Sequence, residues 1–398
     1  MRLKNVRPPK YVSDVMQALE KRGHEVYMVG GCVRDILLCR RPFDWDVCTS
    51  ALPDEIMAVF PHSRPTGLKH GTVTVFSLGS AVEITTFRSD GEYKDHRRPE
   101  SVRFTGDLKS DLERRDFTMN ALALSLSDEI IDLFGGKEDI ERGIIRCVGI
   151  PERRFDEDAL RMLRAFRFSA VLGFDIEPET LAAIKNKAFL AGELAKERVR
   201  AELEKILLSD SPQIIEDVID FGLLRGIVTP DAERPNLSAL KKLPKKRALR
   251  WSGFCALLKK DGIIGGAEAF LTLLRLDSAS IKNCGRGAAL ALKEAPKDAV
   301  SWKRLLAAYG TETAECAAAA ADALYGQGHL RLFRSVLRSG ECFSLKQLAV
   351  SGGELAGLGF RRTEIGTALS ALLTHVIENP SANDRERLLF LAEKMKTP

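Results

Sequence analysis

The hydrophobic periodicity of this chain changes near Phe155, and this change constrains the fold more than any other feature of the sequence. Before it, β-branched segments with alternating apolar residues, such as TVTVFS (72–77) and AVEITTF (81–87), are interspersed with helical segments. After it, apolar residues recur at helical spacing to the end of the chain. The sequence therefore predicts an α+β protein, with a small mixed sheet and helices in an N-terminal head and an all-α remainder.

The 398 residues are enough for more than one hydrophobic core. Breaks in the helical pattern, for example at GIVTPDAERPN (226–236), suggest how the remainder divides. We expect four parts: a head at 1–150, a neck at 151–225, a body at 226–335 and a tail at 336–398.

The composition argues against a membrane or secreted protein. No window approaches the roughly 20 uninterrupted apolar residues that a membrane helix needs, and no apolar segment follows the basic N-terminus as in a signal peptide. The eight cysteines form no CxxC pair, so we expect reduced, space-filling thiols rather than a zinc site. A cytoplasmic protein is expected, and its net charge of +5 permits a polyanionic partner without requiring one.

Two adjacent glycines stand where a predicted strand, HEVYMV (24–29), meets a predicted helix, CVRDILL (32–38). Gly30 and Gly31 let the backbone approach a ligand closely, and a helix N-terminus presents free N–H groups to an anion. Arg34, about one turn into the helix, can add a charged contact to phosphate. By itself, such a glycine pair is more often a plain turn.

Two aspartates flank Trp45 in a segment predicted to be a strand, DWDVCT (44–49). On a strand, Asp44 and Asp46 face the same side. They would repel each other without a cation, and Mg²⁺ prefers such oxygen ligands together with substrate phosphates. A pair of metals could activate a 3′-hydroxyl and hold a triphosphate. Glu83, among apolar neighbours, is either a third acidic group of this site or one partner of an ion pair with an arginine.

Four charged residues recur every three positions after Phe155: Asp158, Arg161, Arg164 and Arg167. A continuous helix would place them along one inclined polar stripe, with the apolar side chains packed on another face. On charge alone, this pattern is typical of a salt-bridged surface helix.

Six segments stand in an order typical of one enzyme family: GGCVRDILLCRRPFDWDVCTS (30–50), EITTFR (83–88), DHRRPESV (95–102), RRDFTMNA (114–121), FDEDALRMLRAFRFSA (155–170) and KERVRAELEKILLS (196–209). They resemble the class II CCA-adding tRNA nucleotidyltransferases, which belong to the polymerase β-like superfamily together with bacterial poly(A) polymerases. The resemblance implies a Mg²⁺-dependent enzyme that adds CMP, CMP and AMP from CTP and ATP to the 3′ end of tRNA and releases diphosphate.

By this resemblance, Asp44 and Asp46 are the Mg²⁺ ligands, and Glu83 matches an acidic position of the active-site sheet. The positions that match nucleotide contacts are Gly31, Arg34 and Arg115, and those in the ribose-recognition motif are Asp116 and Asn120. The last of the six segments is expected to support the base-reading helix through Glu197, Arg198 and Glu202.

The resemblance also assigns base recognition to Asp158 and Arg161, and the chemistry fits. Cytosine and adenine each present an amino donor beside a ring-nitrogen acceptor, which an ionised Asp158 and Arg161 complement. Uracil and guanine present the reverse pattern, and each buried mismatch costs roughly 1–3 kcal/mol. Arg164 and Arg167 would hold the phosphates or the geometry of this pair.

Several alternatives remain at this stage. A poly(A) polymerase is disfavoured by the mixed charge of the C-terminal part, whereas A-addition alone is not separable from full CCA addition. A non-catalytic RNA-binding protein would not need both motifs intact, and a small-molecule nucleotidyltransferase would not need the long helical part. That part is expected to hold tRNA by shape and backbone, with candidate basic stretches at 241–251 and 331–338.

The polar residues 88–103 are expected to form a mobile loop. DNA is not an expected partner. The oligomeric state stays open.

Overall fold

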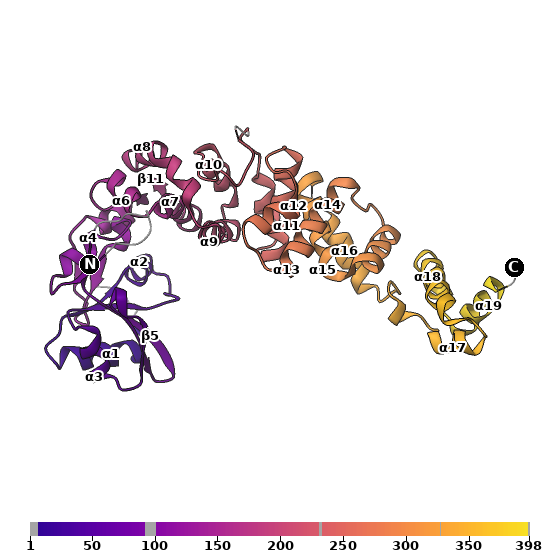
Figure 1. The fold of residues 1–398 in the computed structure, drawn as a ribbon, viewed down its shortest axis with the longest axis horizontal. Helices are drawn as coiled ribbons and strands as arrows, with labels where there is room; N and C mark the ends of the chain where they lie inside the picture. The colour runs from indigo at the N-terminus through magenta and orange to yellow at the C-terminus, as the bar shows by residue number, and fades with distance from the viewer. Residues whose placement is uncertain (1–6, 92–100, 231–232, 327, 397–398) are drawn as a thin grey trace. The chain divides into compact units, whose positions relative to one another are not determined.

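The computed structural model describes residues 7–91, 101–230, 233–326 and 328–396. Its contacts divide the chain into two units, the first made of 1–202 with 221–224 and the second of 203–220 with 225–398. The predicted α+β class is confirmed, because the strands lie in the first unit and the described part of the second is helical (Figure 1). Within the described ranges, no helix is long and apolar enough to cross a membrane.

A seven-stranded sheet forms the centre of the head, in the order β3-β4-β5-β2-β1-β8-β9. The strands are β1 (Val26–Val29), β2 (Asp46–Thr49), β3 (Ser63–Gly67), β4 (Thr72–Ser77), β5 (Ser80–Thr86), β8 (Leu122–Leu124) and β9 (Ile130–Asp132). The pair β2–β5 is parallel and the other neighbours are antiparallel. The parallel register sets Asp46 beside Glu83, so two acidic candidates share one place on the sheet.

Five helices accompany this sheet: α1 (Lys10–Glu20), α2 (Gly31–Leu37), α3 (Pro53–Val59), α4 (Leu108–Glu113) and α5 (Gly136–Arg142). The predicted helices over 11–22, 32–38 and 53–60 are confirmed, and α1 buries its predicted apolar face. The turn from β1 into α2 has Gly30 at φ +76°, a left-handed conformation that favours glycine.

Two sequence predictions for the head need correction. The strand predicted from Asp44 begins only at Asp46, because Asp44 lies in a bend before it. Residues 88–103 were predicted to be a loop throughout, but β6 (Arg88–Asp90) and β7 (Val102–Phe104) pair antiparallel at its two ends. These strands are short and polar, so they carry little of the apolar alternation that marks a strand. Residues 92–100, with most of DHRRPESV, lie outside the described residues.

The predicted continuous helix from Phe155 is also wrong. The chain forms α6 (Pro151–Glu157) and α7 (Leu160–Leu172), and Asp158 between them is extended, with φ −143° and ψ 101°. Its carboxylate accepts a hydrogen bond from the Leu160 N–H, at 3.1 Å, as aspartates at helix starts commonly do. The periodicity continues across the break, and therefore could not reveal it.

The neck continues with α8 (Pro178–Lys187) and α9 (Lys196–Leu207), both predicted. A small parallel pair of two-residue strands, β10 (Ile144–Ile145) and β11 (Asp175–Ile176), shows that the strands do not stop entirely at Phe155.

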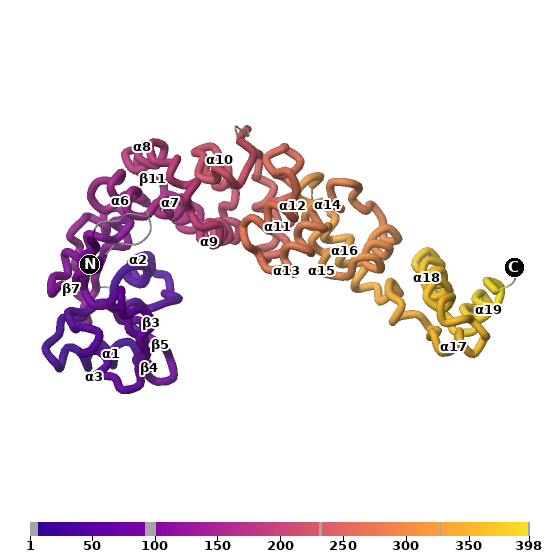
Figure 2. The backbone as a smooth tube through the Cα atoms, in the orientation of Figure 1, coloured from indigo at the N-terminus to yellow at the C-terminus, as the bar shows by residue number. Residues whose placement is uncertain are grey.

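The second unit is built from helices, which Figure 2 follows as a tube from α10 to α19. They are α10 (Ile215–Asp220), α11 (Arg247–Lys260), α12 (Ala267–Leu273), α13 (Ser278–Ser280), α14 (Arg286–Lys293), α15 (Ala299–Tyr325), α16 (His329–Arg338), α17 (Gly352–Gly357), α18 (Arg362–Glu378) and α19 (Arg385–Met395). Trp251, Trp302 and Phe333 are fully buried in it, and a separate apolar cluster lies within 342–392. The division of the chain at residues 150, 225 and 335 stays a prediction.

All eight cysteines are free thiols, and seven of them are buried. The expectation that cysteines fill space in the interior is therefore confirmed for these seven. Cys39 is exposed.

Candidate active site

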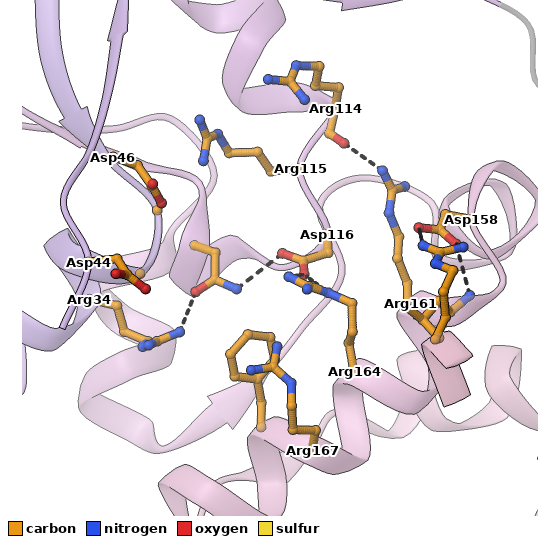
Figure 3. A pocket seen from close by; sticks show the side chains of 16 residues that line it. Arg34, Asp44, Asp46, Arg114, Arg115, Asp116, Asp158, Arg161, Arg164 and Arg167 are labelled. Carbon is orange, nitrogen blue, oxygen red and sulfur yellow. Dashed lines mark hydrogen bonds and ion pairs between the residues drawn. The ribbon is translucent and has the colours of Figure 1, made fainter. Parts of the chain in front are cut away.

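One cavity of the first unit, with a volume of about 540 Å³, gathers nearly all the predicted site residues (Figure 3). It is lined by Gly30, Gly31, Arg34, Asp44, Asp46, Arg114, Arg115, Asp116, Asn120, Asp158, Leu160, Arg161, Arg164, Arg167, Phe168 and Arg198. Glu83 is the one predicted site residue outside this lining. The cavity thus joins segments that are more than 100 residues apart in the sequence.

The two predicted metal-binding carboxylates point away from the protein interior. Asp44 and Asp46 are exposed and Trp45 between them is buried, so the predicted alternation of faces holds although the strand is shorter. Within the described residues, no hydrogen bond or ion pair involves the carboxylate of Asp44, Asp46 or Glu83. The arginine partner considered for Glu83 is therefore not found there.

The electrostatics of Asp46 favour a cation beside it. The surrounding protein raises the pKa of this carboxyl by desolvation; Arg115 opposes the rise, and the carboxylates of Glu83 and Asp44 add to it. When a cation binds beside the carboxyl groups, it offsets the repulsion between the like charges that raises such a pKa. The described residues contain no group of three side chains able to enclose a metal ion. An ion held by Asp44 and Asp46 would therefore take its other ligands from water or from a substrate, as Mg²⁺ commonly does.

A chain of hydrogen bonds fixes the middle of the cavity. Arg34 Nη1 donates to Asn120 Oδ1 at 2.8 Å, and Asn120 Nδ2 donates to Asp116 Oδ1 at 3.1 Å. Arg164 Nε donates to Asp116 Oδ2 at 2.7 Å. Burial would raise the pKa of Asp116, but Arg164 and Asn120 outweigh it and hold the pKa well below its ordinary value. The two residues of the predicted ribose motif thus position two arginines of the site.

Three arginines surround the buried ring of Phe168. The guanidinium carbons of Arg167, Arg34 and Arg164 lie 3.7, 5.2 and 5.5 Å from the ring centroid, within the range of cation–π attraction. Burial lowers the pKa of Arg167 to about 10, so it stays protonated at neutral pH. Because arginines outnumber aspartates in the lining, the cavity suits a polyphosphate anion.

Arg115 approaches the backbone of the glycine turn. A Cβ added at Gly30 would lie 3.0 Å from Arg115 Nη1, so glycine keeps this approach open. Asp111, fully buried, pairs with Arg115 at 3.0 Å and with Arg114 at 2.7 Å. The Nε of Arg115 is buried and has no hydrogen-bond partner among the described residues.

Asp158 and Arg161 are both hydrogen-bonded to other residues of the first unit. Arg198 on α9 donates two hydrogen bonds, of 2.8 and 3.1 Å, to the carboxylate of Asp158. Arg161 pairs with Glu157 at 2.6 Å and donates to the Arg114 carbonyl at 2.8 Å. Arg198 on α9 thus contacts Asp158 as predicted, and it also lines the cavity itself. The role of this segment in reading the base stays a prediction.

Figure 3 shows how these groups are distributed. Asp44 and Asp46 lie on one side of the cavity with Arg34, Asp158 and Arg161 lie on the other side, and Arg164 and Asp116 lie between them. Two carboxylates without a partner among the described residues suit a metal ion, the central arginines suit a triphosphate, and the acid and arginine on the far side suit a base. A mixed sheet that carries such a site is typical of the nucleotidyltransferase class of enzymes.

Comparison with known proteins identifies the family. Residues 26–146 match the family model of the poly A polymerase head domain, and 173–234 match the probable RNA and SrmB-binding site of polymerase A. The CCA-adding enzymes of Geobacillus kaustophilus and Limosilactobacillus fermentum are 37% and 36% identical to the chain. The first alignment covers 98% of this chain and 99% of its relative, and the second covers 96% of each.

Among solved structures, the Bacillus stearothermophilus CCA-adding enzyme in complex with CTP superposes with a TM-score of 0.81. It is 33% identical, and the match covers 98% of both chains. The chain therefore belongs to the family of CCA-adding enzymes, and membership implies that it uses a divalent metal ion.

Proposed function

We propose that this protein adds CMP, CMP and AMP, from CTP and ATP, to the 3′ end of tRNA and releases diphosphate at each step. One observation carries the proposal: a single cavity holds, on one side, two carboxylates that have no partner among the described residues and, on the other, an acid and an arginine suited to cytosine and adenine. Its place is the cytoplasm, where tRNA, ATP and CTP occur together, and DNA is not a substrate.

Asp44 and Asp46 would hold Mg²⁺, and the residues present fit this ion. They offer hard oxygen donors that have no partner among the described residues, and one or two carboxylates completed by substrate phosphates are the usual Mg²⁺ site. When bound, Mg²⁺ lowers the pKa of the attacking 3′-hydroxyl and neutralises charge on the triphosphate. Glu83, beside Asp46 in the register, would add negative charge that attracts the ion without entering the cavity.

The triphosphate would lie between the carboxylates and the neck, against Arg34, Arg115 and the Gly31 backbone. Arg34 and Arg164 are already held in place by Asn120 and Asp116. Little side-chain entropy then remains to be lost when the nucleotide binds, which is the benefit of a preorganised site.

The base would be read by Asp158 and Arg161, which keep capacity for it. Oδ2 of Asp158 accepts one hydrogen bond from Arg198, so a lone pair remains for the exocyclic amino group. Arg161 uses its Nη atoms for Glu157 and two carbonyls, and its Nε–H is left for the ring nitrogen. Uracil or guanine would leave both partners mismatched, at roughly 1–3 kcal/mol each.

The tRNA body would be held by the second unit. A cavity of about 840 Å³ there is lined by Lys242, Arg331, Arg334 and Arg338, among others. It brings together the two basic stretches that the sequence singled out, at 241–251 and 331–338. Within the first stretch, however, Arg250 is buried and bonded to three main-chain carbonyls, so it supports the fold instead.

The proposal is tested with tRNA that lacks its three terminal nucleotides, incubated with Mg²⁺, CTP and ATP. We expect extension by three nucleotides and then arrest, with two cytidines incorporated before one adenosine. A matched substrate that already ends in CC should gain one adenosine. Activity restricted to that second substrate would identify an A-adding enzyme, and a long adenosine tail would identify a poly(A) polymerase. Either result would overturn the proposal.

A further inference from the structure

The segment between α2 and β2 carries an exposed aromatic residue, Phe43, immediately before the first of the two proposed metal-binding carboxylates in the chain. Phe43 is 95% exposed, the highest value among the large apolar side chains that the structure describes, with Leu78 next at 68%. Neither a hydrogen bond nor an ion pair joins the side chains of Arg40 and Arg41, also exposed, to another described residue. Exposed arginines next to an exposed aromatic ring are typical of surfaces that bind single-stranded nucleic acid.

The position of Phe43 relates it to one particular nucleotide. It directly precedes Asp44, so their Cα atoms are about 3.8 Å apart. The ribose whose 3′-hydroxyl attacks must come close to Asp44 and Asp46 if these residues hold the metal. Phe43 does not line the cavity, so a base in contact with it would lie at the edge of the cavity on the side of Asp44, whereas Asp158 and Arg161 lie across the cavity.

We propose that Phe43 stacks on the 3′-terminal base of the tRNA, and that Arg40 and Arg41 contact the phosphates that precede it. This inference rests on the proposed function, because it takes the 3′ end of tRNA as the acceptor. The acceptor base changes during the reaction, from the base that precedes CCA to the first and then the second cytosine. Stacking tolerates such change because every base has a π-face, whereas hydrogen-bond readout would not.

The experiment measures equilibrium binding of tRNA and single-turnover addition for wild type, Phe43→Ala and Phe43→Trp. Two acceptors are compared: one ends in a normal nucleotide, and the other ends in an abasic nucleotide that keeps its 3′-hydroxyl. We expect Phe43→Ala to weaken binding of the normal acceptor about tenfold, since an aromatic–base stack is worth roughly this much. The KM for CTP should not change, and Phe43→Trp should bind at least as tightly as wild type.

The abasic acceptor separates stacking from a structural role. Wild type should bind it about tenfold more weakly than the normal acceptor, whereas Phe43→Ala should bind both alike, as a double-mutant cycle requires of partners in contact. The matched control is Phe189→Ala, which removes another exposed phenylalanine, 56% exposed, outside the cavity lining. Arg40→Ala and Arg41→Ala should each reduce the slope of log K against log salt for tRNA binding by a little less than one, because each removes about one phosphate contact.

Equal losses by Phe43→Ala on the normal and abasic acceptors would overturn the proposal, as would a rise in the KM for CTP matching the loss in tRNA affinity. Failure of the proposed function gives a different result: wild type would extend neither acceptor. The binding comparison would still decide whether Phe43 contacts the terminal base.

Discussion

The two sides of the cavity differ in how much of their electrostatics the protein itself completes. On the side proposed for the metal ion, the carboxylates of Asp44 and Asp46 take part in no hydrogen bond or ion pair among the described residues. On the base side, Arg198 already pairs with Asp158, and Glu157 already pairs with Arg161. Both sides carry carboxylates, but within the part of the chain that the structure describes Glu157 and Asp158 form ion pairs, whereas Asp44 and Asp46 form none.

This difference matches two chemical tasks. A metal site must release and rebind its ion and phosphates, so carboxylates that repel each other until a cation arrives are suitable there. A base-reading site must reject UTP and GTP, and rejection requires donors and acceptors that cannot turn away from a mismatched base. The ion pairs with Arg198 and Glu157 provide this rigidity. We therefore expect substitutions on the metal side to abolish the reaction and those on the base side to change its choice of nucleotide.

The largest effect is expected for Asp44→Ala. Loss of this carboxylate removes a metal ligand, and metal ions contribute several kcal/mol to such transition states, roughly 10³-fold or more in rate. Single-turnover incorporation of CTP should become undetectable. The matched control is Asp54→Ala, an exposed aspartate on α3, which should keep wild-type rates. Near-normal turnover in Asp44→Ala would place the metal elsewhere and remove the contrast between the two sides.

The next effect concerns selectivity. Asp158→Ala combined with Arg161→Ala removes both base-reading groups, so the preference for CTP and ATP over UTP and GTP should fall by roughly 10²- to 10⁴-fold. Competition between nucleotides during incorporation measures this ratio, and calorimetry checks that Mg²⁺ binding survives. Arg153→Ala, exposed on the neighbouring helix, is the control. Unchanged selectivity in the double variant would show that the base is read by other residues.

The contrast between the two sides also explains what could be predicted from the sequence. The side proposed for the metal ion is local: Asp44, Asp46, Gly31 and Arg34 lie within 16 residues of one another. The motif in which they stand predicted that they share one site, and they do line one cavity. Its strand was predicted too long, but the alternation around Trp45 still gave the correct faces. The seven-stranded order was not predictable, because it depends on pairing between segments distant in the chain.

The base side depends on contacts over long sequence distances. Arg198 lies 40 residues from Asp158, and Arg114 offers its carbonyl to Arg161 from 47 residues away. Helical periodicity reports which face is apolar, but not which polar residues pair across elements. The break in the helix at Asp158 was not predicted for the same reason, although an aspartate two residues before an apolar run is a signal for a helix start.

The ion pair between Asp116 and Arg164, which lies between the two sides, can be tested by a stability measurement. Asp116→Asn removes the charge that holds Arg164, and we expect a loss of about 2 kcal/mol in the free energy of unfolding. This is less than the roughly 3–5 kcal/mol of a fully buried pair, because the Arg164 side chain is 33% exposed. The pKa of Asp116 in the folded protein lies below the value near 4 of an unfolded aspartate.

The ion pair with Arg164 therefore stabilises the fold fully above about pH 4, and its contribution is lost as the pH falls through the folded pKa. Denaturant unfolding of wild type and Asp116→Asn should show the largest difference at neutral pH and a smaller one toward pH 3. Asp54→Asn, an exposed substitution, should show neither effect. A difference that stays constant with pH would mean that Asp116 acts through packing rather than charge.

The smallest effect is expected in the second unit, where Arg331 and Arg338 line a cavity and form no ion pair with another described residue. Arg331→Ala combined with Arg338→Ala removes two cations that line the basic cavity. We expect tRNA binding to weaken about tenfold and the slope of log K against log salt to fall by about 1.5, because roughly 0.7–0.9 counterions are released per phosphate contact. Selectivity among nucleotides should not change. Arg362→Ala, exposed on α18 and outside that cavity, is the control, and an equal loss in this variant would show that the effect reflects total charge rather than a defined tRNA site.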